Sequence, residues 1–249
     1  MPPVRHHAKV HGIVLLSGGL DSTTVAAHAL RAGWNVRGLC IRYGQRHERE
    51  VEAALAVAGR LGIPCQVADA RFYGDLAAYS ALTSDMPLPP TRDAAAMAAA
   101  IPNTYVPLRN TFFVTAAAAA LESWMLGLID GGREAASLRP AVFVGANAVD
   151  YSGYPDCRPE FYDALTEVLR LGSKLGMQHG VRITIEAPII RMSKAEIARY
   201  ADELGAPTDL TWSCYAGGDA PCGTCDSCIL RANGFREAGL ADPALVPRP

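Results

Sequence analysis

Short apolar runs alternate with helical patterns in the first part of the chain, and this alternation restricts the fold more than any other feature. Each run has the length of a buried strand, and each helical pattern ends at a glycine. In order, the sequence predicts a strand at 11–16, a helix at 22–31 before Gly33, a strand at 36–41, an amphipathic helix at 48–61 before Gly62, and a strand at 64–68. The order βαβαβ predicts a parallel sheet with helices on its faces.

Regular periodicity fails at residues 84–107, where five prolines surround a short alanine-rich patch. We expect a long loop or lid there, because structureless segments of that length in compact domains are usually functional or disordered. Beyond it the same alternation resumes, with helices at 111–127, 160–175 and 194–204 and strands at 141–144 and 182–187. The chain thus predicts about five strands.

The run Ser17-Gly18-Gly19-Leu20-Asp21-Ser22 lies between the first predicted strand and its helix. At that place backbone N–H groups and the positive end of the helix dipole favour an anion such as pyrophosphate. The glycines let the backbone approach a phosphate closely, the serines can donate hydroxyl hydrogen bonds, and Asp21 suits a helix cap or a Mg²⁺ ligand. The run matches neither GxxxxGK[ST] nor GxGxxG. Taken alone, it is equally well explained as a tight turn with an N-cap.

Four of the seven cysteines form the pattern C-x7-C-x2-C-x2-C near the C-terminus, at Cys214, Cys222, Cys225 and Cys228. Four thiolates with two short spacings can close tetrahedrally around Zn²⁺. An iron–sulfur cluster and a metal-free redox tail are the alternatives. A closed four-cysteine site has no open coordination position, so we predict one structural zinc ion per chain. We divide the chain into an α/β domain at 1–209 and a zinc-binding segment at 210–249 that packs on it.

Composition favours a small-molecule enzyme of the cytoplasm. The chain has 249 residues, half of them hydrophobic, which suits one large core, and its net charge of −2 gives no surplus for a nucleic-acid backbone or an anionic membrane. The apolar stretch at 112–125 is interrupted by polar residues and is shorter than the roughly 20 residues of a bilayer span. Residues 1–9 lead into a short strand rather than an apolar signal core, so we expect no export. Clustered cysteines in odd number favour a reducing compartment.

Several segments together resemble the 7-cyano-7-deazaguanine synthases of queuosine precursor biosynthesis, and SGGLDS resembles the PP-motif of the wider ATP pyrophosphatase superfamily. The segments are SGGLDSTT at 17–24, YGQRHERE at 43–50, IPNTYVPLRN at 101–110, GANAVDYSGYPDCRPEF at 145–161, and SCY…CGTCDSCILRANGFREAG at 213–239. They follow the family's order over nearly the whole chain. Leu108, where many family members have a small residue, and residues 172–177 depart from the pattern.

This resemblance implies a nucleotide α-hydrolase-like (Rossmann-like) α/β fold, with a five-stranded parallel sheet, helices on both faces and a small C-terminal zinc-binding segment. It implies a homodimer that converts 7-carboxy-7-deazaguanine and ammonia to 7-cyano-7-deazaguanine (preQ0) with ATP and Mg²⁺. A carboxylate is a poor acceptor for ammonia, so it must first become an acyl adenylate. The resulting amide needs a second activation by ATP before AMP leaves and the nitrile forms.

The resemblance also assigns roles to residues around the phosphate loop. ATP is expected to bind Leu16, Ser17, Gly18, Gly19, Leu20, Asp21, Ser22, Thr23 and Lys194. Asp21 and Ser22 are predicted to act in catalysis with Arg109 and Asn110, which precede a buried helix and suit a carboxylate or phosphate. A helix cap with a solvated charge is the plain alternative for Arg109 and Asn110, and a first-turn surface lysine is the alternative for Lys194.

Substrate contacts are expected where two predicted strands end, since ligands of open α/β sheets gather at the carboxyl edge. The predicted set is Tyr43, Gln45, His47, Asn147, Asp150, Tyr154, Asp156 and Arg158. A carboxylate such as Asp150 or Asp156 suits the amino and ring N–H groups of a guanine-like base. Ordinary loop and turn chemistry remains the alternative. Cys157 is expected to be a packing residue, because adenylation needs no thiolate.

Three rival functions remain open at this point. A PP-loop tRNA sulfur transferase would use the same phosphate loop with catalytic or cluster-binding cysteines, and the acidic balance of the chain argues against it. A homologue could instead conjugate a deazaguanine to a macromolecule. A regulatory nucleic-acid-binding module with a zinc-ribbon-like tail is the third, and the net charge does not support it.

Overall fold

A five-stranded parallel sheet forms the centre of the molecule, as the sequence predicts. The computed structural model describes residues 9–45, 47–87, 101, 103–147 and 154–245. The strands lie in the order β3-β2-β1-β4-β5, and every neighbouring pair is parallel. Their bounds are β1 (Lys9–Leu15), β2 (Asn35–Arg42), β3 (Cys65–Asp69), β4 (Leu138–Phe143) and β5 (Thr184–Glu186).

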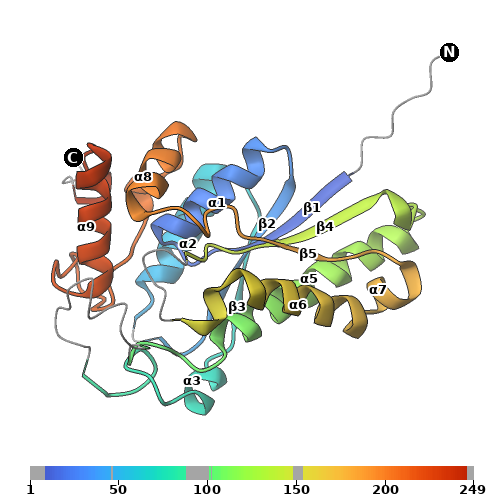
Figure 1. Ribbon diagram of the computed structural model, residues 1–249, viewed down its shortest axis with the longest axis horizontal. Coiled ribbons are helices and arrows are strands. Elements are labelled where there is room, and N and C mark those ends of the chain that lie inside the picture. Colours follow the sequence, from blue (N-terminus) through green and yellow to red (C-terminus); the bar gives the residue numbers. More distant parts are fainter. Residues whose placement is uncertain (1–8, 46, 88–100, 102, 148–153, 246–249) are drawn as a thin grey trace.

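Helices cover both faces of this sheet, so the molecule has three layers (Figure 1). On one face lie α1 (Leu20–Arg31), α2 (Arg49–Leu61), α8 (Lys194–Glu203) and α9 (Asp226–Ala238). The other face carries α5 (Arg109–Asp130), α6 (Pro159–Gly172) and α7 (Lys174–His179). The short elements are α3 (Phe72–Leu76), η1 (Ala135–Ser137), η2 (Pro155–Cys157), η3 (Thr208–Leu210) and η4 (Pro243–Leu245).

The two faces of the sheet bury separate apolar cores. Along β1, Ile13 and Val14 point in opposite directions and pack into different cores, because successive side chains of a strand alternate between faces. Ile13 lies with Leu121 of α5, whereas Val14 lies with Val25 of α1 and Ile197 of α8. Burial on both faces explains the unbroken apolar runs at residues 12–15 of β1 and 141–143 of β4.

The helix predicted at 160–175 is in fact two helices. Ser173 is extended (φ −109°, ψ 147°), so α6 ends at Gly172 and α7 begins at Lys174. The Ser173 hydroxyl accepts a hydrogen bond from the backbone N–H of Gly176 at 3.0 Å. A serine that caps a new helix competes with continuation of the old one, and this competition breaks the predicted helix.

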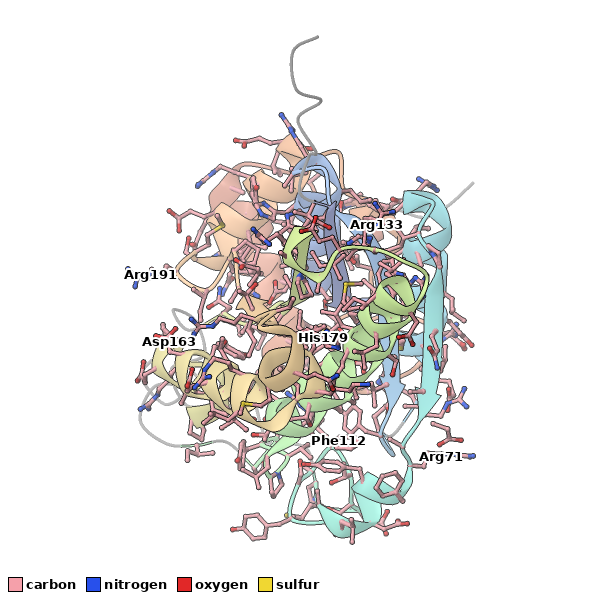
Figure 2. All side chains as sticks on the ribbon, turned by 90° about the vertical axis from the view of Figure 1, so that its right-hand side faces the viewer. Arg71, Phe112, Arg133, Asp163, His179 and Arg191 are labelled. Atoms are coloured by element: carbon pink, nitrogen blue, oxygen red, sulfur yellow. The ribbon has the colours of Figure 1, made fainter. Side chains whose placement is uncertain are left out.

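Helix α5 is longer than predicted and packs on the centre of the sheet. By length and composition alone it could cross a membrane, which corrects the expectation that this stretch is too short. Its buried side chains, Val114, Ala117, Leu121 and Met125, lie in the core beneath β1 and β4. In the first turn of α5, the ring of Phe112 (labelled in Figure 2) stacks on that of Tyr73 of α3, with the two ring centroids 4.4 Å apart. These contacts are those of a core helix in a folded domain.

The C-terminal segment packs directly on the α/β domain. Helix α9 runs against α8, and its Phe235 lies in the same core as Ile197. The buried Arg231 bonds to Asp242 through Nε (2.6 Å) and Nη2 (2.8 Å) and to Thr211 through Nη1 (2.8 Å). The division of the chain at residue 209 stays a prediction. Most of the predicted lid at 84–107 lies outside the described residues.

Candidate active site

A cavity of about 310 Å³ opens at the carboxyl edge of the sheet, beside the ends of β1 and β4. The chain leaves β1 towards β2 and β3 on one side, whereas β4 and β5 lie on the other. Ligands of open α/β sheets bind at such a reversal of strand order. Predicted site residues that line the cavity are Ser17, Gly19, Leu20, Asp21, Ser22, Tyr43, Arg109, Asn110, Asn147, Tyr154 and Lys194.

The phosphate loop is a compact turn at the start of α1. The Ser17 and Ser22 hydroxyls lie 3.0 Å apart, and the Ser22 hydroxyl also donates to the carbonyl of Gly19 at 3.2 Å. Gly18 has a φ of +79°, and a Cβ there would stand 2.6 Å from backbone atoms of α2. Gly145, just after β4, approaches so closely that its Cβ would meet the Ser22 nitrogen at 2.9 Å. The close packing of the loop therefore requires glycine at both positions, Gly18 within it and Gly145 beside it.

Lys194 brings an ammonium group to this loop from a distant part of the sequence. It is the first residue of α8, whose N-terminus is held by a capping box of Ser193 and Glu196. Its Nζ lies 2.9 Å and 2.8 Å from the two carboxylate oxygens of Asp21, and both side chains are largely shielded from solvent. The loop sequence itself carries no lysine, so Lys194 brings a positive charge to it from α8.

Arg109 and Asn110, the first residues of α5, also line the cavity. The Arg109 Nη1 is 3.5 Å from the Tyr43 hydroxyl, and burial raises the pKa of Tyr43 to about 12. The Asn110 backbone N–H donates to Asp156 Oδ2 at 3.1 Å, and its amide donates to the Cys157 sulfur at 3.2 Å. Asp156 therefore caps α5. Burial raises the pKa of the Cys157 thiol to about 11, the opposite of what a nucleophile requires.

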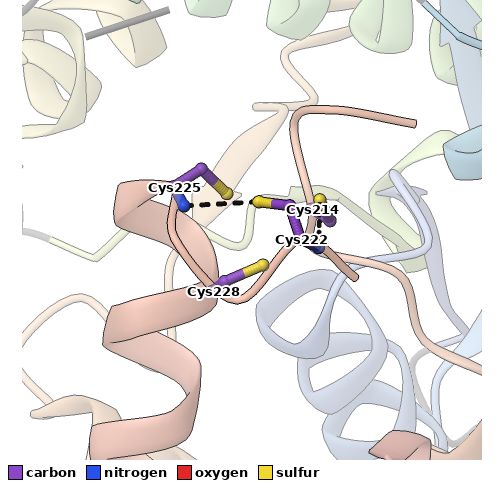
Figure 3. Close-up of side chains that lie close together, drawn as sticks. All are labelled: Cys214, Cys222, Cys225 and Cys228. Atoms are coloured by element: carbon purple, nitrogen blue, oxygen red, sulfur yellow. Dashed lines mark hydrogen bonds between the residues drawn. The ribbon is translucent and has the colours of Figure 1, made fainter. Parts of the chain in front are cut away.

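The four cysteines of the C-terminal segment meet in one cluster, although Cys214 and Cys228 are separated by a loop (Figure 3). Their four sulfur atoms all lie within 4.8 Å of one another. Sulfurs bound to one Zn²⁺ at about 2.3 Å would be about 3.8 Å apart, so a small contraction closes the site. Backbone N–H groups of Ala216 and Cys222 point at the Cys214 sulfur at 3.4 and 3.3 Å and oppose the increase in its pKa that burial causes. The residues present fit a structural zinc ion.

Comparison with known proteins agrees with this geometry. The model of the family described as "Queuosine biosynthesis protein QueC" matches residues 11–239. The chain belongs to the QueC family. Relatives named 7-cyano-7-deazaguanine synthase include that of Thermoplasma acidophilum, which is 45% identical over 93% of this chain and 90% of the relative. The relative from Nostoc sp. PCC 7120 is 46% identical over 93% of this chain and 95% of its own. The solved NMN synthetase of Francisella tularensis covers 96% of this chain and 90% of its own, at 15% identity and a TM-score of 0.40, too distant to bear on function.

The remaining predicted residues of this QueC-family chain lie away from the described cavity wall. Leu16 is buried behind the loop, and the Thr23 backbone N–H bonds to the carbonyl of Gly19. Gln45 accepts from the backbone N–H of Tyr43 at 2.9 Å, and Arg158 is exposed at the start of α6. His47 packs against Gly217 of the cysteine loop. Asp150 lies outside the described residues, and its role stays a prediction, as do those of Gln45, His47, Asp156 and Arg158.

The sequence indicates that the cysteine-rich tail shapes one wall of the active site, but it does not indicate which residues do so. Those that line the cavity are Trp212, Ser213, Tyr215, Ser227, Leu230 and Arg231. Their approach depends on long-range packing, for which the sequence has no local motif. Glu50 of α2, which also lines the cavity, was not predicted. A signal for it exists, because Glu50, Ala54 and Val57 follow helical spacing and place a carboxylate on the buried stripe of α2.

Proposed function

We propose that this protein is a carbon–nitrogen ligase that converts 7-carboxy-7-deazaguanine and ammonia to 7-cyano-7-deazaguanine with ATP. The observation that carries the proposal is one cavity that holds a phosphate-binding loop at one wall and Arg109 with Tyr43 at another. The relatives named 7-cyano-7-deazaguanine synthase support the same substrate class. A nucleotide and a planar base can thus meet in one enclosed site.

Chemistry defines the route. The substrate carboxylate attacks the α-phosphorus of ATP, a C–O–P linkage forms, and pyrophosphate leaves. Ammonia then attacks the acyl carbon, a C–N bond forms, and AMP leaves with the electrons of the C–O bond. In a second round the amide oxygen attacks the α-phosphorus of another ATP and pyrophosphate leaves. Loss of AMP, with the electrons of the C–O bond, and of both N–H protons then yields the nitrile, so two ATP are used and no oxidant is needed.

The protein's side chains divide this work between binding and orientation. The backbone N–H groups at the start of α1, with Ser17 and Ser22, suit the β- and γ-phosphates, and Asp21 suits the Mg²⁺ that accompanies ATP. Lys194, which pairs with Asp21, neutralises the same phosphates. Arg109 suits the substrate carboxylate, because a guanidinium grips two oxygens at once. The four-cysteine site holds zinc in a structural role.

We further propose that the protein works in a reducing compartment such as the cytoplasm and forms a homodimer. All seven cysteines are free thiols, which suits that compartment. Val168, Leu171 and Met177 are 58%, 56% and 64% exposed on α6 and α7 and offer apolar surface for a second copy. Light scattering in solution tests the dimer, and the mass of a single chain would contradict it.

Mass spectrometry of the reaction products tests the function. Purified, zinc-replete protein is incubated with ATP, Mg²⁺, ammonium and 7-carboxy-7-deazaguanine. We expect the nitrile together with AMP, and omission of ammonium should leave the acid unconverted. An amide that accumulates would locate a failure in the second activation. Unchanged acid in the presence of bound ATP would reject the substrate.

A further inference from the structure

Glu50 is a carboxylate on the cavity wall without an assigned role. It lies in the first turn of α2, the helix that also carries the buried residues Val51, Ala54 and Val57. Like the predicted substrate residue Tyr43, it lines the cavity. A carboxylate at such a position costs free energy unless it is paired or functional. Within the described part of the chain, its pKa is governed by burial and by the charge of Arg109, with no hydrogen bond contributing.

The position of Glu50 is fixed by the phosphate loop itself. A Cβ on Gly18 would stand 2.6 Å from the Glu50 carbonyl oxygen and 2.6 Å from the Ala54 nitrogen, so the first turn of α2 lies directly against the loop. Arg109 of α5 lines the same cavity, near enough for its charge to act on Glu50. The carboxylate therefore shares the cavity with both the loop expected to bind the phosphates and the arginine expected to bind the substrate carboxyl group.

Its surroundings keep this carboxylate ready to exchange a proton near neutral pH. Burial raises the pKa of Glu50 to about 7, and the positive charge of Arg109 opposes the increase. The neighbouring phenol of Tyr43 and thiol of Cys40 each have a pKa raised to about 12 by burial. The Cys157 thiol, further along the wall, has a pKa of about 11 for the same reason, and Asp21 is paired with Lys194.

The proposed chemistry needs a group of this kind. Ammonia is mostly ammonium at neutral pH and must lose a proton before its nitrogen can attack. The amide nitrogen must lose its N–H protons as the C≡N bond forms and AMP leaves. The phosphate loop offers N–H and hydroxyl donors, and a closed zinc site offers no open position, so neither is suited to accept these protons.

We propose that Glu50 is the acid–base residue that accepts protons from the reacting nitrogen. The carboxylate takes one proton from ammonium before the nitrogen lone pair forms the C–N bond, and a second proton from that nitrogen as AMP departs with the electrons of the C–O bond. In the second round it takes the two N–H protons in turn, one from the adenylated amide and the other as the C–O bond to AMP breaks and the nitrile forms. Each proton passes to solvent between steps, so the carboxylate is regenerated. This role rests on the proposed function.

Glu50→Gln separates the nitrogen steps from adenylation. Exchange of pyrophosphate into ATP, measured with the acid and without ammonium, should remain within about threefold of the parent. Amide formation from ammonium should fall about 100-fold or more, the range of general-base effects. Hydroxylamine, which is largely unprotonated at neutral pH, should still capture the acyl adenylate as a hydroxamate. With the concentration of free ammonia held constant, the rate of amide formation in the parent protein should rise with pH through about 7, and this rise should disappear in Glu50→Gln.

Glu52→Gln is the matched control, because Glu52 is exposed on the same helix and pairs only weakly with Arg49 at 3.4 Å. It should change none of these rates, and Glu50→Asp should retain part of the pH dependence. Parent-like amide formation from ammonium in Glu50→Gln would overturn the role. Loss of pyrophosphate exchange or of hydroxamate formation in that variant would overturn it too, since the carboxylate would then serve binding. Failure of exchange in the parent protein would instead reject the proposed function.

Discussion

Lys194 and Asp21 form an ion pair in the place where ATP phosphates are expected. Replacing Lys194 by Gln removes the ammonium and leaves Asp21 without its cation. A hydrogen bond that involves a charge contributes about 1.5–3 kcal/mol, so ATP affinity should fall roughly ten- to hundredfold. Calorimetric titration with ATP and Mg²⁺ measures the loss. Lys174→Gln, at the exposed first residue of α7, should bind ATP like the parent; equal affinity of both variants would remove Lys194 from the phosphate site.

Leu108 occupies a backbone conformation that usually requires glycine. Its φ is +55°, the one positive value among the non-glycine residues that the structure describes, and its side chain is 63% exposed. Leu108→Gly should remove strain of about 1–2 kcal/mol and, after the entropy cost of glycine, stabilise the fold by about 0.5–1 kcal/mol. Urea unfolding checks the sign. Leu55→Gly, at an exposed position inside α2, should instead lose about 1 kcal/mol.

At the scale of elements, the cysteine loop and α9 should depend on zinc for their structure. Cys225→Ser is expected to lose the metal that the parent binds at one ion per chain, as measured by atomic absorption. A loss of even about 2 kcal/mol would lower Tm by about 4–8 °C for a chain of this size. The loop reaches the active site, because the Trp212 backbone N–H bonds to the Gly18 carbonyl at 2.9 Å, so ATP affinity should fall as well.

Cys65→Ser is the control for the zinc prediction, since Cys65 lies on β3, outside the cluster. It should keep one zinc ion and the ATP affinity of the parent. Iron in place of zinc in the parent protein would favour the iron–sulfur alternative. Full zinc content in Cys225→Ser would contradict the four-cysteine site.

The elements show how far the sequence determines the fold. Apolar runs predict all five strands, and they are clearest in β1 and β4, whose side chains pack into the cores on both faces of the sheet. The break at Ser173 was not predicted, because a single capping residue can end a helix whose apolar periodicity continues. The helix α3 was not predicted either, because five residues are too few to show a helical period. At the site, the loop at Ser17–Ser22 and the cysteines have local signatures. The position of Asp156 as a cap on α5 does not, because it depends on contact between distant segments.

At the scale of the whole molecule, Arg231 holds the C-terminal segment together and bonds across its boundary with the domain at the Thr208 carbonyl. It bonds to Asp242, Thr211 and the Thr208 carbonyl, and the Arg231 and Asp242 side chains are only 9% and 5% exposed. Arg231→Met leaves the buried carboxylate of Asp242 without its cation, so the free energy of unfolding should fall by about 3–5 kcal/mol. Chemical denaturation measures it. Arg199→Met, which removes an exposed bond from α8 to the Glu237 carbonyl, should change stability by less than about 0.5 kcal/mol.

Glu50 should also change how the free energy of unfolding depends on pH, and this effect can be measured independently of activity. Its pKa is about 7 in the folded protein, against an ordinary value of 4.5. Between these values the folded state binds more protons than the unfolded state, so this group makes stability fall as pH rises from about 4.5 to about 7. Glu50→Gln abolishes that term. The variant should therefore be more stable than the parent at pH 8, by about 1–3 kcal/mol, and the difference should shrink towards zero near pH 4.5. Urea unfolding at pH 8 and pH 4.5 measures this difference in the free energy of unfolding. The control variant Glu52→Gln should have the same stability as the parent at both pH values. A variant less stable than the parent at pH 8 would mean that the ionised carboxylate is a structural partner, whereas the predicted gain would show that the fold gives up stability to keep a proton acceptor beside its phosphate loop.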